Sequence, residues 1–256
     1  MRTLILACGL LSVFAVCGHA FVCETPQAGG PCLHWSQGGA TLRTLLGSSG
    51  AMLDNGTLNW DQNALNAAND WNMAGASFHY TVNFGGQAGD PCACPGPADA
   101  NPVTFSDSAC GGGFGDIVGE TQNCYKIQTG ELVNSSVFLN SNYAWNAYDG
   151  ALRPPVNDAR RVLLHEFGHV LGLAHPNDFG QNVVAIMNSR ESDIDRLQSD
   201  DIAGIFSLYP NGSGSGGVSG ASTGNGCAIA TNGGEPSWPL WATVVAAALI
   251  ATRHRR

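Results

Sequence analysis

The stretch HEFGHVLGLAH constrains the fold and the chemistry of this chain more than any other part of its sequence. His165 and His169 are four residues apart, so on a helix they project from one face and can bind one metal ion. Glu166 then lies beside that metal without being needed as a ligand. His175 is too far along to share this face, but Gly172 accepts the positive φ angle that ends a helix and turns the chain. We therefore expect three imidazole ligands and one open position, as in a catalytic zinc site.

The rival interpretation is a helix in which histidines recur without binding a metal. A bare HExxH pattern occurs by chance in many proteins, but a glycine and a third histidine at fixed offsets make coincidence remote. The sequence thus predicts His165, His169 and His175 as zinc ligands. Glu166 is the predicted catalytic residue.

The full pattern HExxHxxGxxH resembles the signature of the metzincin zinc peptidases. Met187, twelve residues after the last histidine, matches the methionine of the Met-turn that lies beneath the metal in that group. Taken alone, it would fit equally well as a methionine that fills a gap in the core. Among metzincins the chain is most similar to the matrixins, which include the matrix metalloproteinases, above all in the segment SDDIAGIFSLY at 199–209. It departs from them at Pro176, where serine is usual, and it lacks the ligand tyrosine that serralysins and astacins carry two places after the methionine.

This resemblance implies an α+β fold, a metzincin-like domain with a mixed twisted sheet, a zinc-site helix and a C-terminal helix. It implies a metalloendopeptidase that hydrolyses peptide bonds with a zinc-activated water, while Glu166 passes the water proton to the leaving amine. A protein or peptide substrate would then lie extended along an edge strand near 133–139. The alternative is a catalytically silent surface binding module stabilised by its metal, against which the intact Glu166 argues.

The beginning of the chain is typical of an exported protein. Residues 1–20 combine a short basic start, an apolar run and small residues before a cleavage site after Ala20, which predicts a secretory signal peptide. The six cysteines between the signal and residue 124 then predict three disulfide bridges rather than a metal site. They are Cys23, Cys32, Cys92, Cys94, Cys110 and Cys124. A Cys23–Cys32 bridge would close a short loop, and the pairing of the other four stays open.

The charge balance limits the partners. The chain has 11 basic and 20 acidic side chains and a net charge of −9. So acidic a surface repels nucleic acid and anionic lipid, and we expect neither as a partner.

The C-terminal residues predict a segment that is not part of the catalytic domain. Residues 211–226 form a Gly/Ser-rich linker, and within 227–256 an apolar stretch at 236–252 precedes a cluster of arginines. This reads as a transmembrane helix with a cytoplasmic end. It resembles the C-terminal sorting signals of Gram-negative bacteria, which implies an exported bacterial protein held at the cell envelope or released. Cleavage near Cys227 and a retained anchor are both open.

Between these ends we expect an N-terminal edge segment at 21–55 and one catalytic domain at 56–210. Periodicity predicts helices at 59–74, from 157 or 158 onward, and at 199–209, and strands at 76–84, 117–127 and 132–140. His79 falls on the polar face of its strand. The segment 85–116 is expected to be a loop, and its carboxylates are candidate calcium ligands. These are Asp90, Asp99, Asp107 and Asp116.

Overall fold

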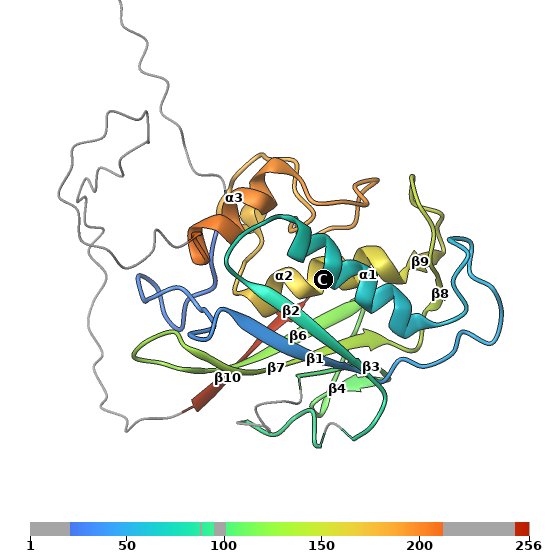
Figure 1. Ribbon diagram of the computed structural model, residues 1–256, viewed down its shortest axis with the longest axis horizontal. Coiled ribbons are helices and arrows are strands. Elements are labelled where there is room, and N and C mark those ends of the chain that lie inside the picture. Colours follow the sequence, from blue (N-terminus) through green and yellow to red (C-terminus); the bar gives the residue numbers. More distant parts are fainter. Residues whose placement is uncertain (1–20, 88, 95–100, 212–248, 256) are drawn as a thin grey trace, which may run out of the picture.

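The computed structural model describes residues 21–87, 89–94, 101–211 and 249–255. Its centre is a mixed sheet with the strand order β10-β6-β7-β3-β1-β2. Two helices, α1 (Trp60–Met73) and α2 (Ala159–Leu171), lie along one face of this sheet, and α3 (Ser199–Leu208) lies beyond α2 (Figure 1). The expected α+β fold, with its mixed sheet, metal-site helix and C-terminal helix, is confirmed.

The sheet combines parallel and antiparallel pairing. β1 pairs in parallel with β2 and β3, and β3 pairs in parallel with β7. In contrast, β6 is antiparallel to β7, and β10 is antiparallel to β6. Two small two-stranded ladders and a short 3-10 helix, η1 (Pro176–Phe179), complete the described elements. The strands are β1 (Gly39–Thr44), β2 (His79–Phe84), β3 (Asn101–Ser106), β4 (Ser108–Ala109), β5 (Gly112–Gly113), β6 (Gly119–Lys126), β7 (Leu132–Asn140), β8 (Ala144–Asn146), β9 (Val156–Asp158) and β10 (Leu249–Arg255).

Several strands, including β1 and β3 of the central sheet, lie where the sequence predicts none. β1 falls inside the 21–55 segment and β3 inside the 85–116 segment. The loop expected at 85–116 is therefore wrong at 101–106, and also at the short strands β4 and β5. Glycine and threonine in β1, and asparagine and proline in β3, are typical of loops. Leu42 and Val103 are nevertheless fully buried, and parallel partners far away in the sequence supply the backbone hydrogen bonds. Tertiary pairing therefore decides these strands rather than local propensity.

The outer strands also differ from expectation. β7 is paired with β6 on one side and, at 137–140, with β3 on the other, so β7 is an interior strand and not the edge expected at 133–139. The strand beyond it is β6, whose outer edge is paired with β10. Residues 249–252, the end of the expected membrane segment, belong to β10, while 236–248 lie outside the described residues. Within the described part of the chain, no helix is long and apolar enough to cross a bilayer.

Four aromatic side chains fix the position of α2 through hydrogen bonds to its backbone carbonyl groups. They come from α1, from β2, from the segment before β1 and from the residue after α3. Two of the four carbonyls belong to the last turn of the helix, where no backbone N–H is available within the helix. The donors and acceptors are Trp71 Nε1 to Leu164 O at 2.9 Å, Tyr80 Oη to Phe167 O, Trp35 Nε1 to Val170 O at 2.7 Å and Tyr209 Oη to Leu171 O at 2.7 Å.

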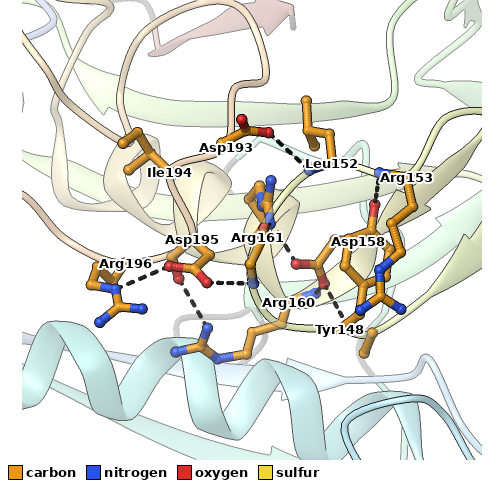
Figure 2. Close-up of polar contacts among 12 residues, drawn as sticks. Tyr148, Leu152, Arg153, Asp158, Arg160, Arg161, Asp193, Ile194, Asp195 and Arg196 are labelled. Atoms are coloured by element: carbon orange, nitrogen blue, oxygen red, sulfur yellow. Dashed lines mark hydrogen bonds and ion pairs between the residues drawn. The ribbon is translucent and has the colours of Figure 1, made fainter.

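An ion network holds two loops against the start of α2 (Figure 2). Arg161 is fully buried, and its guanidinium donates to Ser192 O at 2.7 Å and to Gly150 O. Its Nε lies 3.4 Å from Asp158 Oδ2. Asp195 joins the same loops, because it accepts from Gly150 N at 2.7 Å. The segments near 150 and 192 are thereby locked to the first turn of the helix.

The six cysteines form three bridges, as the sequence predicts. The pairs are Cys23–Cys32, Cys92–Cys110 and Cys94–Cys124. The last bridge ties the long segment after β2 to β6. Three disulfides are typical of a chain that folds outside a reducing compartment.

Candidate metal centre

The helix that carries the first two histidines has defined ends. At its start, the side chain of Asp158 accepts a hydrogen bond from Arg160 N, which caps the helix. At its end, Gly172 has φ 101°, and a Cβ atom there would lie 2.2 Å from Leu33 O. Only glycine meets both conditions, the left-handed backbone and the close approach. The turn at this glycine returns the chain so that His175 faces the helix.

The three histidines converge on one point, as the sequence predicts. Their Nε2 atoms lie 3.0 Å apart between His165 and His169, 2.9 Å between His169 and His175, and 3.1 Å between His165 and His175. A tetrahedral zinc with bonds of about 2.0–2.1 Å requires nitrogen atoms about 3.4 Å apart, so a small outward movement of the rings admits the ion. All three side chains are buried.

The outer nitrogen of each ring faces an oxygen atom. His165 Nδ1 lies 2.7 Å from Ile186 O, and His169 Nδ1 lies 2.8 Å from Leu173 O. His175 Nδ1 lies 3.0 Å from Asp178 Oδ2. These oxygens accept hydrogen bonds, so they favour the tautomer in which each ring donates from Nδ1 and directs an Nε2 lone pair at the common centre. Three lone pairs facing one another repel, so this donor set fits a cation.

Glu166 lies beside this centre on the same helix. Its side chain is buried, and its Oε2 accepts a hydrogen bond from Thr121 Oγ1 of β6 at 2.8 Å. Its Oε1 lies next to Gly119 at the start of β6, where an added Cβ atom would lie only 2.7 Å away. β6 therefore both orients this carboxylate and leaves space for it.

Met187 is buried and packs against α2 at Gly168, one residue before His169. An added Cβ at Gly168 would approach its Sδ to 2.1 Å, so the glycine is what admits the methionine. The turn around Met187 is held by Asp201 of α3, whose carboxylate accepts from Ile186 N at 2.9 Å and Met187 N at 3.2 Å. Burial raises the pKa of Asp201 to about 6, although these backbone donors oppose the rise. α3 thus supports the turn that hydrogen-bonds to His165.

Several residues that contact the metal centre are not marked by any motif or periodic pattern in the sequence. Glu24, Thr121, Asn123 and Asp178 lie next to the histidines or Glu166, yet only Asp178 is close to one of them along the chain. Among the described residues, the histidine triad is the one group of three or more His, Cys, Asp or Glu side chains placed to share a metal ion. The candidate calcium ligands Asp90, Asp107 and Asp116 form no such group, and Asp99 lies outside the described residues. His79 is exposed on its strand, as expected.

Comparison with known proteins agrees with this geometry. Residues 101–210 match the family model described as matrixin. The chain is also similar to metalloprotease AprA of Pseudomonas entomophila (strain L48), with 33% identity over 92 residues. That match covers 32% of this chain and 18% of the relative, so the chain spans less than a fifth of the relative's length.

Proposed function

Residues 101–210 belong to the matrixin family of zinc metallopeptidases, and from this premise we propose that the chain is an exported zinc-dependent endopeptidase. The cofactor is zinc, which the triad of His165, His169 and His175 fits. We assign the catalytic role to Glu166. The observation that supports this proposal most strongly is that three buried Nε2 atoms converge beside the carboxylate of Glu166. This carboxylate is held by a hydrogen bond from Thr121 and is not one of the three metal ligands.

The chemistry follows from the positions of these groups. Zinc, when bound, lowers the pKa of a coordinated water and polarises the carbonyl group of the peptide bond. Glu166 takes the proton of the attacking water and delivers it to the nitrogen of the leaving amine. The hydrogen bond from Thr121 holds one carboxylate oxygen, so the other is directed toward the space beside Gly119. The negative charge of Glu166, which accepts the proton, is therefore oriented before the substrate binds.

The path of the substrate is set by β6. This strand contacts Glu166 through Thr121 and the second histidine through Asn123, which donates to His169 O at 2.9 Å. A peptide that lies extended over the metal would pair with the outer edge of β6, backbone to backbone. In the structure, that edge is taken by β10 in antiparallel register, from Leu249 opposite Lys126 to Arg255 opposite Glu120. The C-terminal strand and a substrate would therefore compete for one position.

We also assign the ends of the chain to export. Residues 1–20 act as a signal peptide, and 211–226 act as a linker between the domain, which ends at 210, and a C-terminal sorting signal at 227–256. The support is the sequence pattern together with the three disulfide bridges of the domain. The protein would be displayed on a bacterial cell envelope or released from it. Intact mass of the protein recovered from its host decides the fate of the tail, since a chain that still ends at Arg256 would rule out processing.

A hydrolysis assay tests the proposed activity. The wild type, oxidised and loaded with zinc, should cleave an unfolded protein, and Glu166→Ala should lose about 10²–10⁴-fold of that rate because the general base is removed. Equal rates for the two proteins would reject the peptidase and leave the silent, metal-stabilised binding module.

A further inference from the structure

The segment before β1 reaches the metal centre. Residues 22–24 run antiparallel to 172–174: Glu24 N donates to Gly172 O, and Ala174 N donates to Val22 O, each at 2.8 Å. This pairing brings Glu24 beside the second histidine, although the two are far apart in the sequence. The segment lies outside the region matched by the matrixin family, 101–210.

The carboxylate of Glu24 is buried against the ring of His169. Its Oε1 lies 3.2 Å from His169 Nδ1, and its Oε2 accepts a hydrogen bond from Asn123 Nδ2 at 3.1 Å. Asn123 is fixed in turn, because its Nδ2 also donates to His169 O and its Oδ1 accepts from Ser135 Oγ at 2.7 Å. Glu24 is thus held at the outer nitrogen of the ring, on the side away from the converging Nε2 atoms.

The three histidines differ in what faces their outer nitrogens. His165 Nδ1 faces the carbonyl oxygen of Ile186, whereas His175 Nδ1 faces the carboxylate of Asp178, whose side chain is 53% exposed. His169 Nδ1 faces a carbonyl oxygen together with the carboxylate of Glu24, which is 2% exposed. A buried negative charge is weakly screened by water, so it stabilises a cation bound on the far side of the ring more than an exposed one does.

We propose that Glu24 is a positioning residue of the zinc centre, which orients His169 and strengthens zinc binding through its negative charge. The Cys23–Cys32 bridge and the hydrogen bond from Leu33 N to Glu24 O at 2.8 Å hold the residue in place. The N-terminal segment is therefore part of the metal centre rather than an edge of the domain. This inference rests on the zinc site of the proposed function, but not on peptidase activity.

Zinc affinity of the full chain tests the inference. Glu24→Gln keeps the shape of the side chain and an oxygen for Asn123 but removes the charge. Competition with a chelating dye should show a zinc Kd that is roughly 10–100-fold weaker than that of the wild type. The melting temperature of the metal-free protein should not fall. The matched control is Glu131→Gln, which removes a partly exposed carboxylate paired with Lys126 and should leave the zinc Kd unchanged.

An unchanged zinc Kd in Glu24→Gln, with a lower melting temperature of the metal-free protein, would overturn the inference and make Glu24 a structural residue only. If Glu24→Gln does not fold, Glu24→Asp decides, since it keeps the charge but shortens its reach. Its Kd should be weaker than that of the wild type, and a Kd equal to the wild-type value would contradict the inference. Because the readout is zinc, a failure of the peptidase assay does not bear on this result.

Discussion

Thr121 on β6 donates a hydrogen bond to Glu166 on α2, with 2.8 Å between Oγ1 and Oε2. The sheet therefore sets the orientation of the proposed general base, whereas α2 and the turn after it place the three histidines. Substitutions on β6 and substitutions of the histidines should therefore change the rate of hydrolysis and the zinc content separately.

Replacing Thr121 with valine should lower kcat while zinc content stays at the wild-type level. The hydroxyl is lost at nearly constant volume, so Glu166 keeps its place but not its orientation. We expect a loss on the order of tenfold, smaller than the 10²–10⁴-fold attributed to a general base as a whole. Thr121→Ser keeps the hydroxyl and should retain most of the rate. If both variants lose the rate equally, the hydrogen bond does not explain the effect.

Gly172→Ala should destabilise the fold and weaken zinc binding. The substitution places a Cβ 2.2 Å from Leu33 O at a φ of 101°. The matched control is Gly180→Ala, which also has a positive φ, 77°, but no atom within 4 Å of the added Cβ. The control should lose about 1–2 kcal/mol of unfolding free energy from backbone strain alone. A denaturant titration in which the two variants lose the same amount would contradict the packing role of Gly172.

Removing residues 212–256 should raise kcat/KM severalfold for a peptide substrate. The deletion frees the outer edge of β6, to which β10 is paired in the structure. Steady-state kinetics of the shortened and the full chain, both with equal zinc content, measure the difference. Identical values of kcat/KM would show that β10 does not lie in the path of the substrate.

The stability of the protein should depend on Asp158 between pH 4 and 6. Burial, opposed by Arg161 and backbone donors, raises the pKa of this carboxyl from 3.8 to about 6 in the folded chain. A raised pKa means that the stabilising contribution is fully present below the unfolded pKa and is lost as the pH rises through about 6. The unfolding free energy of the metal-free wild type, relative to Asp158→Asn, should fall by up to about 3 kcal/mol over this range. A difference that stays constant with pH would contradict the assignment.

The sequence predicts the parts of this structure that local patterns determine. The spacing of the histidines and Gly172 fixes the metal site, and the apolar period fixes α1, α2 and α3 within one or two residues. The strands β1 and β3 are missed because their residues are ordinary for loops, and only pairing with distant strands makes them regular. The pairing of Cys94 with Cys124 is likewise decided by the sheet and cannot be read from spacing.

Most of the residues that contact the metal centre but could not be predicted from the sequence are distant from the zinc motif along the chain. Glu24, Thr121 and Asn123 lie on segments far from the zinc motif along the chain, and each reaches it through sheet pairing or a backbone bridge. A single carboxylate or hydroxyl on such a segment has no periodic pattern that would mark it. The prediction of an edge strand at 133–139 is wrong for the same reason, since the order of strands in the sheet is not a local property.

X-ray absorption at the zinc edge measures which atoms bind the metal. The proposed site requires one zinc per chain with three imidazole nitrogens and one oxygen at about 2.0–2.1 Å. Glu166→Ala should give the same spectrum without activity, while His169→Ala should lose most of its zinc. Sulfur ligands at about 2.3 Å, or the loss of a zinc-bound ligand in Glu166→Ala, would contradict it.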